Sequence, residues 1–230
     1  MSRQNRFGPR FAREFTAYSY YFMLSNILFY LSILVPGAWI VFTTPNFFDV
    51  VAIGLMLPGL AALVSCTIKF RESDEKATFG VFKEFIERYK NNFRDTIKYC
   101  FVYALVVFTV FFTVRHGDDL SLFMRVSLIV STSVSTLIVT YMMIVAARFE
   151  FKKTRHLLRV SLYCCLMHFK ITAVLAVAYF VLLFLTLWFG LLMLFLFASP
   201  ILYGIIRLTY PVLDDVYEMF IEKGDGGEAV

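Results

Sequence analysis

Long apolar segments alternate with shorter charged ones along the whole chain. An α-helix needs about 20 predominantly apolar residues to cross the hydrocarbon layer of a bilayer. Six segments approach or exceed this length, and together they predict an all-α, polytopic membrane bundle of six transmembrane helices. We place these spans at residues 20–43, 50–68, 99–114, 122–147, 170–189 and 191–209.

The last two spans form one nearly unbroken apolar run. A single helix over residues 170–209 would be about 60 Å long, roughly twice the hydrocarbon thickness. We therefore expect the run to fold back at Trp188-Phe189-Gly190, where glycine permits a reversal and tryptophan suits the interface. A span followed by an interfacial helix is the alternative for this run. A five-pass chain would place the acidic C-terminus outside.

Basic residues are unevenly distributed around these spans. Of 22 lysines and arginines, all but Arg115 and Arg125 fall in segments that six passes put on one side of the membrane. Cytoplasmic loops are enriched in Lys and Arg, so this asymmetry predicts cytoplasmic N- and C-termini. The composition agrees, because 60% of the residues are hydrophobic and the mean hydropathy is +0.72.

The cytoplasmic loop between Lys69 and Lys98 contains an amphipathic pattern. Its apolar positions recur every three or four residues, as on one face of a helix that lies in the membrane interface and leads into span three. This face comprises Phe82, Phe85, Ile86, Tyr89, Phe93 and Ile97, and the opposite face carries Lys83, Arg88 and Lys90. Such a helix either anchors the bundle or docks a soluble partner through its charged face.

A second cytoplasmic loop, Arg148–Lys170, is strongly basic. Anionic lipid headgroups explain its charge, and an acidic protein surface or a phosphorylated ligand is the sharper alternative. The basic residues are Lys152, Lys153, Arg155, His156 and Arg159, and the expected buried stripe is Leu157, Leu158, Ser161, Leu162, Cys165 and Phe169.

The C-terminal segment differs in charge from the rest. We divide the chain into a single six-span membrane domain, residues 1–210, and a cytoplasmic acidic amphipathic tail, residues 211–230. Pro211 suits the first turn of a helix. An anionic leaflet repels the acidic residues that follow, so we expect the tail to pack on protein, either the chain's own basic loops or a partner.

Span four carries two rows of small hydroxyl side chains. Such residues let membrane helices approach closely and hydrogen-bond to each other, which favours a packing face. Lining the path of a polar solute is the alternative. The rows are Ser127, Ser131 and Ser135, and Thr132, Thr136 and Thr140.

Several classes of function lack their usual residues. No Asp, Glu, Lys or His falls in the middle of a span, which disfavours ion-coupled carriers and voltage sensors. No catalytic constellation, glycine-rich phosphate loop or zinc-ligand spacing is present. We therefore predict a protein that is not an enzyme, with no catalytic, cofactor-binding or metal site and no nucleic-acid partner.

Four short patterns carry a resemblance to a known family. The chain resembles the YesL-like family of bacterial membrane proteins, whose molecular function is unknown, over most of residues 20–210. The patterns are Asn26 followed by Pro36 and Gly37; Pro58-Gly59-Leu60-Ala61-Ala62; Phe82-Lys83-Glu84-Phe85 to Asn91-Asn92-Phe93-Arg94; and Leu158-Arg159-Val160-Ser161-Leu162. The Pro-x-x-Thr-x-Gly run usual in span one is not clearly present.

Members of that family are often encoded beside carbohydrate ABC importers. The resemblance thus implies an accessory or regulatory subunit of such an importer, in the plasma membrane of a bacterium, with the permease subunits as partners. An autonomous small-solute transporter or channel that uses the hydroxyl rows of span four is the alternative. No family active site exists to carry over.

Overall fold

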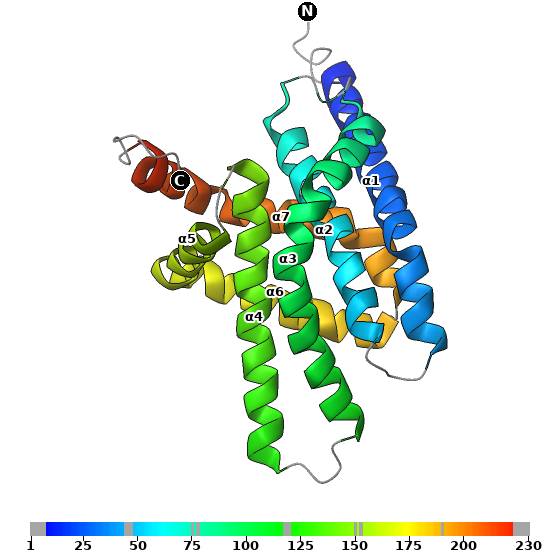
Figure 1. Cartoon of the computed structure of the whole chain (residues 1–230). Helices are drawn as coiled ribbons and strands as arrows, with labels where there is room; N and C mark the ends of the chain where they lie inside the picture. The colour runs from blue at the N-terminus through cyan, green and yellow to red at the C-terminus, as the bar shows by residue number, and fades with distance from the viewer. Residues whose placement is uncertain are drawn as a thin grey trace, which may run out of the picture.

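The protein is helical throughout the part of the chain that its computed structural model describes, residues 8–43, 48–74, 76, 79–116, 121–149, 151, 154–189 and 191–222 (Figure 1). No strand occurs among these residues, so the predicted all-α class is confirmed. The helices are α1 (Gly8–Phe42), α2 (Phe48–Glu72), α3 (Val81–His116), α4 (Leu122–Arg148), α5 (Thr154–Met167), α6 (Phe169–Phe189), α7 (Leu191–Val216) and the π-helix η3 (Tyr217–Glu222).

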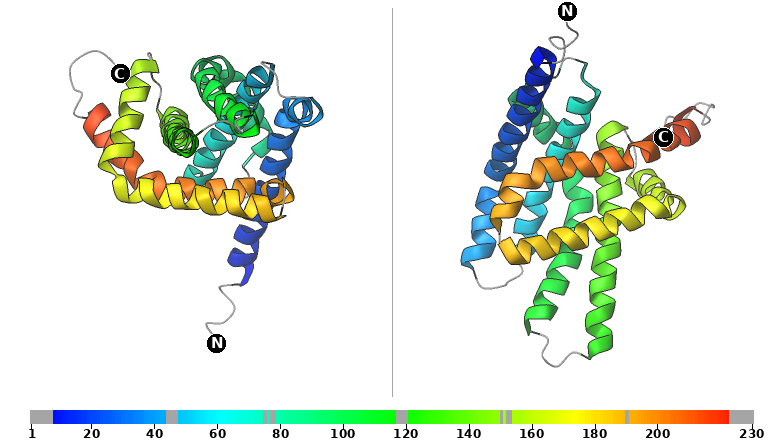
Figure 2. Two further views of the ribbon diagram at one scale, coloured as in Figure 1. Left: turned by 90° about the horizontal axis from the view of Figure 1, so that it is seen from below. Right: turned by 180° about the vertical axis from the view of Figure 1, so that it is seen from behind.

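The first four helices form two hairpins that stand side by side. The end of α1 and the start of α2 lie at the same end of the molecule as the end of α3 and the start of α4, and the end of α2 and the start of α3 lie at the opposite end (Figure 1). The α6–α7 pair forms a third hairpin, which runs across the other two rather than alongside them (Figure 2). Helix α7 contacts both α1 and α2, and α6 contacts α4, so this third hairpin closes one side of the structure.

Helix α2 lies at the centre of the core. It contacts α1, α3, α4 and α7, and every residue from Ala61 to Ile68 is buried. Small residues let neighbouring helices come close to its backbone. A Cβ atom added at Gly59 would lie 2.3 Å from the Ser32 hydroxyl oxygen on α1, so any other residue here would force Ser32 or the two helices to move.

Three helices of the described chain are long and apolar enough to cross a membrane. They are Ala12–Ile40 within α1, Phe48–Glu72 and Leu122–Arg148. A fourth is possible if α5 and the first part of α6, which meet at a 92° bend, count as one broken span. The protein thus has the helices of a membrane protein, while six spans with both termini cytoplasmic stay a prediction.

Two expected boundaries differ from the observed helices. The reversal near Trp188 is confirmed, because α6 ends at Phe189 and α7 begins at Leu191. Pro211, by contrast, was expected to open a tail helix and instead lies inside α7. Proline removes one backbone hydrogen bond and crowds the preceding turn, but α7 continues through it to Val216. The described part of the tail, residues 211–222, is therefore the end of α7 plus η3 rather than a separate helix.

Side-chain hydrogen bonds join the helices inside the core. The Asn26 Oδ1 atom on α1 accepts hydrogen bonds from the backbone N–H and the hydroxyl of Ser199 on α7, both at 2.8 Å. Tyr21 and Thr67 join α1 to α2 with a 2.6 Å contact between their hydroxyl oxygens. Buried polar groups cost free energy unless they are paired, so each of these bonds fixes the relative position of two helices.

Candidate functional site

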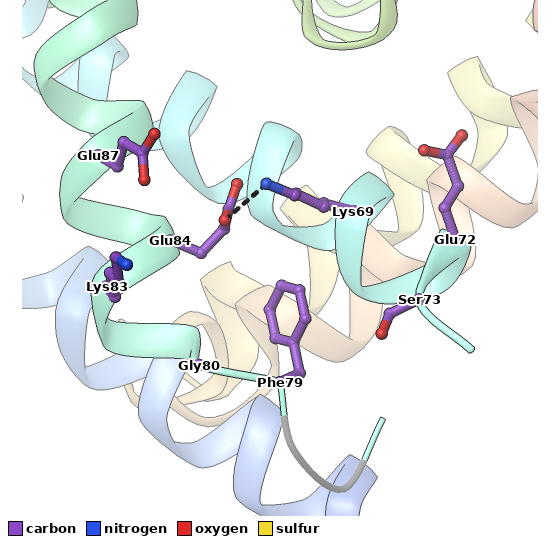
Figure 3. A pocket seen from close by; sticks show the side chains of 8 residues that line it. All are labelled: Lys69, Glu72, Ser73, Phe79, Gly80, Lys83, Glu84 and Glu87. Atoms are coloured by element: carbon purple, nitrogen blue, oxygen red, sulfur yellow. Dashed lines mark hydrogen bonds and ion pairs between the residues drawn. The ribbon is translucent and has the colours of Figure 1, made fainter. Parts of the chain in front are cut away.

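The end of α2 and the start of α3 meet where the Glu84 carboxylate pairs with the Lys69 ammonium group (Figure 3). The Glu84 carboxylate accepts hydrogen bonds from the Lys69 Nζ atom on α2 and from the Arg88 Nε atom one turn later on α3, both at 2.8 Å. Its side chain is only 13% exposed. Glu84 also lies in the first turn of α3, where the helix dipole favours a negative charge.

This arrangement shifts the ionisation of Glu84. Burial raises the pKa of the carboxyl, but the hydrogen bonds and positive charges of Lys69 and Arg88 outweigh burial, and the net pKa of Glu84 is below its ordinary value. The side chain is therefore ionised in the folded protein at neutral pH. We call the group Lys69–Glu84–Arg88 the α2–α3 clamp.

A cavity of about 600 Å³ opens beside the clamp (Figure 3). It lies between the end of α2 and the first turns of α3, and Phe79 supplies an aromatic wall. Charges of both signs surround it, and the exposed side chains of Lys83 and Glu87 stand at its edge on α3. The complete lining is Lys69, Glu72, Ser73, Phe79, Gly80, Lys83, Glu84 and Glu87.

The proposed docking helix is the first part of α3. Phe85 is 3% exposed and belongs to the core, and Ile86, Tyr89 and Phe93 are half-buried. Phe82, however, is 57% exposed, and Val81 takes the buried position at the start of the helix. The buried stripe thus runs Val81–Phe85–Tyr89 with a four-residue period and packs on α2.

The charged face of this helix is only partly free to meet a partner. Lys83 and Lys90 are exposed, as expected. Arg88 is not simply solvated, because it donates to Glu84 within the clamp. A change of Arg88 therefore removes one partner of Glu84, whereas Lys83 and Lys90 can be changed without touching the clamp.

A second charged group lies nearby at the ends of α2, α4 and α7. The ring of Tyr210 has the Arg71 guanidinium 3.9 Å and the Arg148 guanidinium 4.6 Å from its centroid. Its hydroxyl donates to Glu72 at 2.9 Å, and the Arg148 Nη1 atom donates to Asp214 at 2.9 Å. Guanidinium groups attract aromatic faces, so the stack orders three helix ends together.

The acidic tail packs on the chain itself. Besides the Asp214–Arg148 pair, Asp215 lies 3.3 Å from the His168 ring at the α5–α6 bend. Phe220 of η3 contacts the Tyr163 ring of α5 edge-on at 5.3 Å between centroids. The described part of the tail thus contacts the chain's own basic region, which is one of the two surfaces expected for it.

The basic loop forms helix α5. Arg155 and Arg159 are exposed on it, and Lys152 and Lys153 lie outside the described residues. The expected stripe is wrong in part, because Leu158, Leu162 and Phe169 are exposed. The buried positions are Leu157, Val160, Ser161 and Cys164. Leucines lie on both faces of this helix, so periodicity alone could not show which face the protein covers.

The two rows of span four differ in their surroundings. Thr136 and Thr140 hydrogen-bond at 2.8 Å to the hydroxyl groups of Tyr103 on α3 and Tyr179 on α6, and Thr132 is half-buried. Ser127 and Ser131 are exposed and Ser135 is half-buried. The threonine row therefore packs within the chain, whereas the expected close packing around Ser131 is absent among the described contacts.

The sequence alone does not predict the stack around Tyr210 or the hydrogen bonds between tyrosine and threonine side chains. Their partners lie on different helices, as far apart in the sequence as Glu72 and Tyr210, and only the packing brings them together.

Within the described residues, no group of three His, Cys, Asp or Glu side chains could hold a metal ion. No known protein family, curated protein or solved structure matches this chain.

Proposed function

We propose that this protein is a non-enzymatic integral membrane subunit that assists or regulates a carbohydrate ABC importer in a bacterial plasma membrane. Six spans and cytoplasmic termini are part of the proposal, supported by the distribution of Lys and Arg along the chain. The carbohydrate importer comes from the resemblance to the YesL-like family. The partners would be the permease subunits.

The surface at the start of α3 is the observation that carries the proposal. It combines a buried stripe that fixes the helix on α2 with exposed charges at Lys83, Glu87 and Lys90 beside a cavity. Exposed charges of mixed sign give specificity to a protein contact by matching a complementary surface. The clamp holds this surface in one orientation, as a docking site requires.

Reversing the exposed charges tests the proposal without disturbing the clamp. The variant Lys83→Glu/Lys90→Glu should keep its abundance and elution in detergent, because both side chains are exposed. It should lose most co-purification of the permease subunits from native membranes and slow growth on the glycan that the importer takes up. Mass spectrometry of the purified complexes provides the measurement.

The matched control is Arg13→Glu, a charge reversal at an exposed position on α1 that should leave assembly unchanged. A well-expressed double variant that assembles and supports growth like the natural chain would contradict the docking role of α3. Solute flux through the purified protein alone in liposomes would instead favour an autonomous transporter.

A further inference from the structure

Helix α5 carries leucines on two opposite faces, and the protein covers only one of these faces. Leu157, Val160, Ser161 and Cys164 are buried. On the opposite side Leu158, Leu162 and Leu166 are 40%, 37% and 73% exposed, and Arg155 and Arg159 stand beside them. These five positions follow the three- and four-residue spacing of one helix face.

The position of α5 places this exposed face at the charged end of the molecule. Helix α5 begins at Thr154, six positions after α4 ends at Arg148, and Arg148 takes part in the stack around Tyr210. Helix α5 lies across the axis of α4 (Figure 2), and α6 leaves it at a 92° bend. If α4 crosses the membrane along its axis, α5 lies roughly parallel to the bilayer surface.

We infer that the exposed face of α5 is a binding surface for an anionic lipid leaflet. The leucines would enter the boundary between headgroups and acyl chains, and the two arginines would meet lipid phosphates. Helix α5 contains no aspartate or glutamate to repel them. The neighbouring acidic residues Asp214 and Asp215 are paired with Arg148 and His168. This surface is separate from the docking surface of α3.

An environment-sensitive probe tests the inference in the full chain. A fluorophore on a single cysteine at Leu162, in a background without Cys66, Cys100, Cys164 and Cys165, would be reconstituted in two kinds of vesicle. In phosphatidylcholine with phosphatidylglycerol its emission should shift to the blue and be quenched by brominated lipid. In phosphatidylcholine alone both effects should be much smaller. High salt should reverse the difference by screening the charges.

The variant Arg155→Gln/Arg159→Gln removes the charges and keeps the leucines. Each arginine near an anionic surface contributes about 1 kcal/mol, or roughly fivefold, so the double change should weaken insertion about 25-fold. A probe at Glu87, exposed on α3, serves as the control and should report water in both kinds of vesicle. Unchanged elution in detergent would show that the variant folds.

Two results would overturn the inference. One is an emission from position 162 that is the same in both kinds of vesicle, and the other is a blue shift that the double variant retains in full. A shift seen in native membranes but not in anionic vesicles would identify a protein partner for this face instead.

Discussion

At Gly59, α1 and α2 approach so closely that an added side chain would collide with Ser32. An added Cβ atom would lie 2.3 Å from the Ser32 hydroxyl oxygen, and that hydroxyl donates to the Phe29 carbonyl at 2.6 Å. We expect Gly59→Ala to lower the free energy of unfolding by about 1–3 kcal/mol, because the helices must separate or Ser32 must give up its hydrogen bond. Thermal unfolding in detergent would measure this loss.

Gly204 provides the matched control for this prediction. It lies inside α7, and a Cβ atom there would meet nothing within 4 Å, so Gly204→Ala should be neutral or stabilise by about 0.5–1 kcal/mol. Combining Gly59→Ala with Ser32→Ala should recover part of the lost stability, since the closest atom is removed. Equal losses at both glycines would show that the close approach of α1 to Gly59 does not decide the effect, because helix propensity alone would favour alanine at both positions.

Single residues also show where the sequence stops being informative. Gly59 stands out in the sequence as a possible kink beside Pro58, yet its role is to admit the neighbouring helix. Asn26 is conspicuous in an apolar segment, but its partner Ser199 lies 173 residues away. The sequence shows that a polar side chain such as Asn26 lies in an apolar span and needs a hydrogen-bond partner. Only the fold shows which residue that partner is.

Between elements, the α2–α3 clamp makes stability depend on pH. The folded-state pKa of Glu84 is lower than its unfolded value, which is near 4.3. Its ionised form therefore stabilises the fold at pH values above the unfolded pKa. This contribution decreases as the pH falls below that value, and it is lost once the pH passes the folded pKa.

The variant Glu84→Gln isolates this effect. It should unfold at a lower temperature than the natural chain at pH 7, and the difference should shrink toward zero as the pH falls below about 4.3, because a protonated glutamate resembles glutamine. Glu87→Gln, an exposed position one turn along α3, should change little at any pH. A constant difference between the Glu84 variant and the natural chain from pH 7 to acid would contradict the clamp.

The helices themselves were more predictable than their faces. The lengths of the apolar runs predicted the positions of α1, α2 and α4 well, because a membrane span needs a long run of apolar residues whatever it packs against. The interfacial segment and span three were expected as successive helices, and they form the single 36-residue helix α3. In α5 the choice of buried face was wrong for Leu158 and Leu162, because a helix with two apolar faces has no single stripe.

At the scale of the whole molecule, the angle of the α6–α7 hairpin was not predictable. Its apolar run predicted two helices and a turn, which are present. Hydropathy fixes neither tilt nor rotation, which depend on packing against neighbouring helices. The hairpin is held by contacts with α1, α2 and α4, and it crosses them (Figure 2). The side of the membrane reached by its turn therefore decides between six passes and fewer.

Trp188 reports on that side, since it is 73% exposed in the last turn of α6. A single cysteine at Trp188, in a chain without the four native cysteines, should react with an impermeant maleimide on intact cells. A cysteine at the exposed Phe48, next to the α1–α2 turn, should do the same, while cysteines at Ser73 and Thr154 should react only after lysis. Six passes require this pattern because all hairpin turns then face outward.

Two other labelling patterns would contradict six passes with cytoplasmic termini. Labelling from outside of the cysteine at position 48 but not of the one at position 188 would mean that the α6–α7 hairpin stays on the cytoplasmic side. Labelling of the cysteine at position 73 from outside would mean that the orientation is the reverse.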